Sequence, residues 1–81
     1  MTDVLANFEA IESNESATHT LKLKSRKLII TNDSSGVDLL FKLNASEAFG
    51  TLQPTESISM YVTTRQVIIQ AADNYRIWSF G

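Results

Sequence analysis

Hydrophobic and polar residues alternate along most of the chain from residue 19 onward, which is the period-two pattern of strands that bury one face. The first such segment contains Leu21 and Leu23, each followed by a lysine. At Ser25-Arg26-Lys27 the alternation stops, and the apolar positions resume on the opposite parity, as a bulge or tight turn would produce. We therefore expect two consecutive strands, the second of which ends at Thr31.

The chain is expected to reverse at Asn32-Asp33-Ser34-Ser35-Gly36, because these residues hydrogen-bond their own backbone or tolerate positive φ. The strand that follows keeps its apolar residues on one face. These residues are Val37, Leu39, Phe41 and Leu43. Residues 45–50 contain helix formers closed by a glycine, which predicts one helical turn across an open end of the sheets.

The second half of the chain predicts three more strands after an extended segment that contains Pro54. Apolar residues alternate with others in residues 57–62 and again in residues 67–70, so these two strands are expected to form a hairpin. Asp73-Asn74 suits a two-residue connection, and residues 75–80 then run back as a final strand. The expected product is a three-stranded meander.

The N-terminal segment has a different pattern. Four of its apolar residues lie at or beside helical spacing: Val4, Leu5, Phe8 and Ile11. The segment also carries four acidic residues and no basic one. We expect residues 1–18 to form an acidic N-terminal arm or a short helix, and residues 19–81 to form an antiparallel β domain.

Together these patterns predict an all-β fold. About six short strands are expected, and no predicted helix is long enough for the crossover that parallel strands require. The expected architecture is a small antiparallel β-sandwich or a partly open barrel. A chain of 81 residues buries only about 60–65% of its unfolded surface, and small domains often compensate with disulfides, metals or partner subunits. Cysteine is absent, so neither a disulfide nor a cysteine-based zinc site is available, and partner subunits remain.

The charge pattern narrows the range of partners. A net charge of −2 argues against a dedicated nucleic-acid binder with a broad basic face. The basic residues within 22–27 fit the protection of an edge strand better than nucleic-acid contact, although they could also pair with the acidic leader of another subunit. The first residues lack the basic start and apolar run of a secretory signal, and no segment approaches the roughly 20 apolar residues of a membrane-spanning helix. We expect a soluble protein that binds no membrane.

No constellation of residues indicates catalysis, a metal site or a cofactor. His19 is the single histidine and has no partner at the spacing of a nucleophilic motif, so we expect a surface histidine. The three glycines are isolated, which excludes a phosphate-binding loop. Asp33 and Asp38 flank a turn, but two carboxylates fall short of the about six to eight ligands of calcium, and Asp33 is expected to cap the turn. The sequence therefore predicts a protein that is not an enzyme.

The last predicted strand carries large side chains on both faces, with Tyr75 and Ile77 on one and Trp78 and Phe80 on the other. So short a chain cannot cover both faces, and we expect a partner on one of them. Trp, Tyr and Arg are frequent anchors of interfaces. The candidate interface residues are Tyr61, Arg76, Trp78, Phe80, Leu5 and Phe8. The alternative is that Trp78 packs beneath an N-terminal helix.

Four segments follow one another in a recognisable layout. They are Leu28-Ile29-Ile30-Thr31-Asn32-Asp33-Ser34-Ser35, Asp38-Leu39-Leu40-Phe41-Lys42-Leu43, Leu52-Gln53-Pro54-Thr55-Glu56-Ser57-Ile58 and Tyr75-Arg76-Ile77-Trp78. In this layout a strand ending in Asn is followed by a paired strand, a Leu-x-Pro-x-Glu turn and a closing meander. With it, residues 20–81 resemble small β-sandwich structural proteins of tailed bacteriophage virions. The resemblance implies a protein of the virion, made in the host cytoplasm, which associates with itself and with other virion proteins and catalyses nothing.

Two functions are therefore expected. The first is a virion structural protein, such as a capsid decoration or tail-associated subunit, that forms a homo-oligomer and contacts its neighbours through the acidic arm and the last strand. The second is a receptor- or carbohydrate-binding module in which Tyr61 and Trp78 stack on a glycan.

Overall fold

The computed structural model describes residues 8–44 and 48–81 of the chain. The candidate contact residue Leu5 lies outside these residues, as does half of the helical turn expected at 45–50. The described residues contain eight strands and no helix, so the prediction of an all-β fold is confirmed, while the expected number of about six strands was too low.

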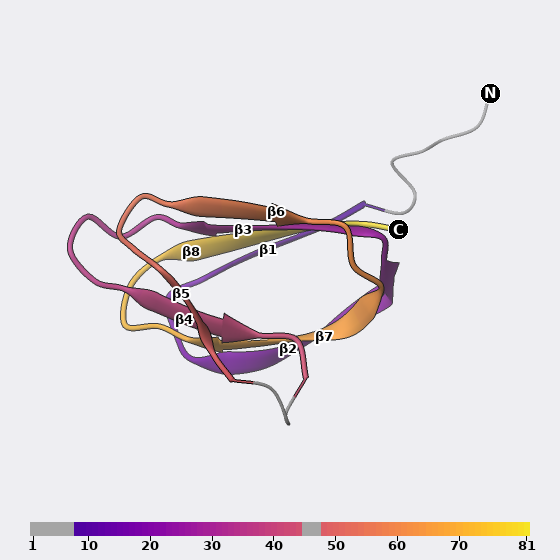
Figure 1. The fold of residues 1–81 in the computed structure, drawn as a ribbon, viewed down its shortest axis with the longest axis horizontal. Coiled ribbons are helices and arrows are strands. Elements are labelled where there is room, and N and C mark those ends of the chain that lie inside the picture. The colour runs from indigo at the N-terminus through magenta and orange to yellow at the C-terminus, as the bar shows by residue number, and fades with distance from the viewer. Residues whose placement is uncertain (1–7, 45–47) are drawn as a thin grey trace.

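The strands form two antiparallel layers that lie face to face, as in a β-sandwich (Figure 1). Sheet A contains, in spatial order, β1 (Phe8–Ser13), β8 (Tyr75–Phe80), β3 (Lys27–Asn32) and β6 (Ser57–Met60). Sheet B contains β2 (Ala17–Ser25), β7 (Thr64–Gln70), β4 (Leu39–Lys42) and β5 (Gly50–Leu52). All the strand pairs in both sheets are antiparallel.

A single hydrophobic core fills the space between the layers. Its buried members come from both sheets: Leu21, Leu28, Ile30, Leu39, Leu52, Val67, Ile69, Tyr75 and Ile77. Alternation within each strand produces this core, because β3 and β8 bury every second residue and expose the residues between. The period-two pattern in the sequence therefore identified the inward positions of β3, whereas for β8 it separated two apolar faces without deciding which is buried.

The predicted break between strands at Ser25-Arg26-Lys27 is present, as a corner between the sheets and not as a bulge or tight turn, and the predicted reversal after β3 is confirmed. The chain leaves sheet B at Ser25 and enters sheet A at Lys27, and this corner is fixed by a 2.6 Å hydrogen bond from the Arg26 N–H to the Phe80 C=O. The reversal after β3 is built on two buried polar side chains. Asn32 accepts a hydrogen bond from the Ser34 N–H, and the Ser34 hydroxyl accepts hydrogen bonds from two backbone N–H groups further along the turn. These side-chain oxygens thus accept hydrogen bonds from the backbone N–H groups of the turn, as its composition predicted.

Strand β1 lies within the segment expected to form an acidic arm or a short helix, and the helix alternative is wrong for the described residues. Phe8 and Ile11, whose spacing suggested a helix, point to opposite faces of sheet A: Phe8 is exposed, whereas Ile11 packs against the core. The physical reason is that one side of β8 has backbone N–H and C=O groups that need hydrogen-bond partners. A neighbouring strand supplies them, whereas a helix packed beside β8 would use its own backbone groups internally. Since β2 already begins at Ala17, the chain belongs to the two sheets well before residue 19.

The expected hairpin and meander in the second half are also wrong. β6 pairs with β3 in sheet A, whereas β7 lies between β2 and β4 in sheet B. The short link from Tyr61 to Thr63 thus carries the chain from one layer to the other. Alternation shows which side chains face the interior, but not which layer a strand joins, because both sheets share that interior.

Candidate interaction surface

Strand β8 presents its second set of large side chains to solvent. Tyr75 and Ile77 are buried toward sheet B, whereas Trp78 lies on the opposite face of sheet A and is 38% exposed. No helix covers Trp78 within the described residues. The strand is therefore apolar on both faces, and the interior of the molecule accounts for only one of them.

The strand registers gather apolar side chains around Trp78. Phe8 of β1 stands opposite Phe80 of β8, and in the next row Ala10, Trp78 and Ile29 lie side by side. These five outward-facing residues, Phe8, Ala10, Ile29, Trp78 and Phe80, are called the aromatic face below. They come from three strands that are remote in sequence and adjacent in sheet A.

The Phe8 ring contacts each of the other two rings of the aromatic face. The centre of the Phe8 ring lies 6.2 Å from the centre of the Trp78 ring, in an edge-to-face arrangement, and 5.1 Å from the centre of the Phe80 ring. Such pairs contribute roughly 0.5–1.5 kcal/mol beyond the area they bury. The contacts fix the positions of the rings, yet Phe8 and Trp78 each keep 38% of their surface exposed. The exposed apolar surface is therefore made of rings packed against Phe8.

Charged side chains border the aromatic face. Arg76 donates two hydrogen bonds to the Asp33 carboxylate, of 2.8 Å and 3.0 Å, and its guanidinium lies 5.8 Å from the centre of the Trp78 ring. The hydrogen bonds and charge of Asp33 raise the pKa of Arg76, so this cation stays charged. At the other end, the Lys27 ammonium lies 5.4 Å from the centre of the Tyr61 ring. An apolar centre with a charged rim is the usual anatomy of a protein interface.

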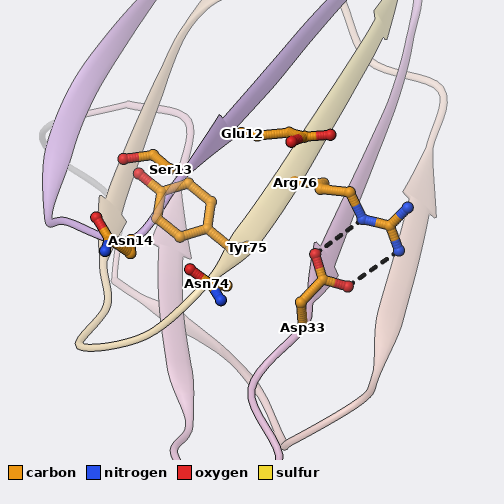
Figure 2. Close-up of a pocket in the computed structure, with 7 residues that line it drawn as sticks. All are labelled: Glu12, Ser13, Asn14, Asp33, Asn74, Tyr75 and Arg76. Atoms are coloured by element: carbon orange, nitrogen blue, oxygen red, sulfur yellow. Dashed lines mark hydrogen bonds and ion pairs between the residues drawn. The ribbon is translucent and has the colours of Figure 1, made fainter.

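A polar hollow of about 400 Å³ adjoins this rim at one end of sheet A. It is lined by Glu12, Ser13, Asn14, Asp33, Asn74, Tyr75 and Arg76. Figure 2 shows the Arg76 guanidinium turned toward Asp33, and the Tyr75 ring on the opposite side beside Ser13. Asp33 therefore forms an ion pair instead of capping the turn, which Asn32 and Ser34 do in its place.

The single histidine is also placed differently from the expected surface position. His19 is half-buried, and burial lowers its pKa. The Tyr75 hydroxyl donates a hydrogen bond to the Glu15 C=O and accepts one from His19 Nε2, both of 2.7 Å. Because the tyrosine has one proton to give, the carbonyl bond requires the tautomer of His19 protonated at Nε2. Burial raises the pKa of Tyr75, so both side chains are neutral structural groups near pH 7.

The outer face of sheet B provides a contrast. Strand registers place Thr18, Ile68 and Lys42 in one row on it, with Thr20 and Gln66 in the next. Leu40 also faces outward, opposite Gln70, and like Ile68 it is partly buried. Among the described residues, none of the large hydrophobic residues that stand exposed belongs to this surface. The exposed apolar surface is thus concentrated on one of the two layers.

The candidate interface residues fall into three groups. Phe8, Trp78 and Phe80 lie together in the aromatic face, and Arg76 lies at its rim. Tyr61 follows β6 and is 84% exposed beside Lys27, and Leu5 lies outside the described residues. Sequence reasoning missed Ala10 and Ile29. Ile29 was detectable, because the middle residue of the apolar run 28–30 must point outward if its neighbours point inward.

Comparisons with protein-family models, curated proteins and solved structures find no match to this chain. The described residues contain no helix that could cross a membrane. Among the same residues, no group of three or more His, Cys, Asp or Glu side chains could hold a metal ion.

Proposed function

We propose that this protein is a non-enzymatic structural subunit that docks on neighbouring subunits through the aromatic face of sheet A. The particular form that we propose is a virion protein of a tailed bacteriophage, attached to a capsid or tail. The observation that carries the proposal is the cluster of Phe8, Trp78 and Phe80 on the solvent side of a sheet whose other side already forms the core.

The asymmetry between the two layers supports docking. Outer surfaces that served only for solvation would carry mainly polar residues on both layers, and sheet B comes closer to this than sheet A, because its outward Leu40 and Ile68 are only partly exposed. Three aromatic rings on one outer face expose apolar surface that a partner can remove from water, at roughly 25 cal/mol per Å². Arg76 and Lys27, held at opposite ends of this surface, are placed to give the contact its orientation.

A protein partner suits the surface better than a glycan. Sugar rings stack on an open aromatic face, but Trp78 has a guanidinium over its ring and the edge of Phe8 against it. Tyr61, the other expected platform, lies on the far side of β3 from Trp78 and has Lys27 over its ring. The two rings do not form one continuous platform, so the receptor or carbohydrate module is the weaker proposal.

The test is the mass of the protein in solution, measured by sedimentation velocity over a range of concentrations. The variant is Trp78→Thr, which removes the largest ring of the aromatic face without opening the core. The matched control is Ile68→Thr, an outward-facing apolar residue on sheet B. We expect wild type and the control to form the same concentration-dependent assemblies, and Trp78→Thr to form smaller ones while remaining folded by circular dichroism.

Identical mass distributions for Trp78→Thr and wild type at every concentration would refute docking through this face. The virion assignment has its own test: an epitope-tagged chain is expressed during phage infection, and particles are purified on a density gradient. Co-purification with intact particles is expected, and its absence would remove the virion assignment while leaving the docking surface in place.

A further inference from the structure

We infer that a second copy of this chain adds to the free edge of β1, antiparallel and with Ala10 opposite Ala10, so that the two A sheets become one. The inference rests on the proposed function, because it names the first neighbour in the assembly. It concerns the backbone edge of sheet A, which borders the aromatic face and shares Ala10 with it.

The four sheet edges are protected to very different degrees. β5 and β6 are short, with three and four residues. β2 carries Lys22 and Lys24 and has a register shift between Thr20 and Ser25. Short strands, lysines and irregular pairing are the usual defences of an edge against other strands. β1 has six residues, regular pairing with β8 throughout, and neither lysine nor proline. Its one inward-pointing charge, Glu9, is already bonded to the Lys22 N–H of the same chain.

Side chains also form hydrogen bonds to backbone groups of β2, and this distinguishes its edge from that of β1. The Glu9 carboxylate accepts a hydrogen bond of 2.9 Å from the Lys22 N–H. The Arg65 guanidinium donates to the carbonyl oxygens of Leu21 and Lys22. Among the described residues no comparable side-chain bond reaches the backbone of Phe8, Ala10 or Glu12. The edge of β1 is thus the one that remains able to pair.

The hydrogen bonds of neighbouring strands show which groups of β1 face outward. The Asn74 and Phe80 carbonyls accept bonds from the β3 side, so the even-numbered residues of β8 direct their backbone toward β3. The odd-numbered ones then face β1, and they stand opposite Glu9, Ile11 and Ser13. The N–H and C=O groups of β1 that point away from β8 are therefore those of Phe8, Ala10 and Glu12, and they have no partner among the described residues.

These three residues are self-complementary in one register. With Ala10 opposite Ala10 of the second copy, Phe8 stands opposite Glu12 of that copy and Glu12 opposite its Phe8. Each such pair exchanges two hydrogen bonds, which gives roughly six in total. A slip toward the N-terminus places Glu9 opposite Glu9, where like charges repel, and a slip toward the C-terminus loses one bonded pair. The sequence of β1 is therefore complementary to the same strand of a second copy in this one register.

This pairing also extends the aromatic face. Ala10 lies beside Trp78 in the same row, so the joined row would read Trp78, Ala10, Ala10, Trp78 across the two copies. The small alanine side chains at the symmetry axis leave the two ring clusters on one continuous outer surface. A closed two-fold contact of this kind is the commonest symmetry of soluble oligomers.

The test compares two proline variants at equivalent edge positions. Ala10→Pro removes an N–H that points away from β8, so the existing ladder keeps its hydrogen bonds. Ser59→Pro is the matched control, because Ser59 occupies the same row on the opposite edge of sheet A and its N–H points away from β3. By sedimentation equilibrium, we expect Ala10→Pro to raise the dimer dissociation constant by roughly tenfold or more and Ser59→Pro to leave it unchanged.

Two further variants keep the test independent of folding. Ala10→Lys is compatible with a strand but places like charges at the two-fold axis, and it should also dissociate the dimer. Because the chain has no cysteine, Ala10→Cys can be oxidised cleanly; bonded pairs have Cα atoms about 5.5 Å apart, within disulfide range, so a covalent dimer should form. Ser59→Cys should not form one.

A monomeric wild type, an unchanged dimer in Ala10→Pro and Ala10→Lys, or equal cross-linking of Ser59→Cys would each overturn the inference. A dimer that persists in Trp78→Thr while larger assemblies disappear separates the edge from the aromatic face. A dimer of wild type that never docks further would overturn the proposed function and leave the edge contact standing.

Discussion

Replacing Asn32 by aspartate should cost this small fold much of its stability. The Asn32 side chain is 2% exposed and uses its amide fully: Nδ2 donates to the carbonyl oxygens of Val37 and Leu52 at 2.8 Å and 3.1 Å, and Oδ1 accepts from the Ser34 N–H at 3.0 Å. It thereby joins the end of β3 to the start of β4 and to β5. Aspartate has nearly the same shape but turns the two donors into an oxygen that faces two carbonyls.

The magnitude follows from those bonds. Losing two hydrogen bonds contributes about 1 kcal/mol each, and leaving buried carbonyls without partners adds about 1–3 kcal/mol. The total of roughly 3–5 kcal/mol compares with a stability of about 4–12 kcal/mol for a domain of 81 residues. Burial and the two carbonyls also raise the pKa of the new carboxyl. Its protonated form can donate one bond, so the loss should be smallest at low pH and should grow as pH rises through that pKa.

The assay is urea unfolding of Asn32→Asp and wild type, followed by circular dichroism at about pH 7 and pH 4. Asn14→Asp makes the same chemical change at an exposed turn position and should lie within about 0.5 kcal/mol of wild type. A loss below about 1 kcal/mol in Asn32→Asp at pH 7, or a loss that increases on acidification, would refute this reasoning.

Three other changes have defined outcomes. Burial lowers the pKa of His19, so the unfolding free energy should fall as pH drops below about 6.5, and His19→Gln should lack that part of the pH profile; an unaltered profile would contradict it. Thr55 has a φ of 68°, and Thr55→Gly should raise the free energy of unfolding in urea by up to about 1 kcal/mol. A lower free energy of unfolding would show that the backbone is not strained there. A methyl group at Gly50 would lie 2.8 Å from the Phe41 ring, so Gly50→Ala should lower the melting temperature, at a cost of about 1–3 kcal/mol; an unchanged melting temperature would argue against close packing at this pair.

Much of the inside of the fold was predictable from alternation. The inward residues of β3 have the period-two spacing that the sequence shows, and alternation separated the two faces of β8 without deciding which is buried. The switch of parity marked the corner at Arg26, and the turn after Asn32 carries the residue types that such reversals need. These features are local, because each depends on a few consecutive residues.

The features that the sequence did not predict depend on pairing between remote segments. Phe8 and Ile11 have a spacing that suits a helix as well as the two faces of a strand, and only the open side of β8 decides between them. Likewise, β6 and β7 have the sequence pattern of a hairpin, but β6 pairs with β3 in one sheet and β7 pairs with β2 in the other. The aromatic face was predicted in part: Trp78 and Phe80 shared a face by alternation, but Ala10 and Ile29 joined them only through the strand registers.

The central claim is that assembly covers the outer face of sheet A. Trp78 is the single tryptophan of the chain and lies at the centre of that face, so its intrinsic fluorescence reports directly on coverage. We expect the emission to shift to shorter wavelength, and quenching by acrylamide to weaken, as the protein concentration rises through the range in which sedimentation shows assembly. An emission and a quenching constant that stay the same while the mass increases would mean that the subunits meet elsewhere.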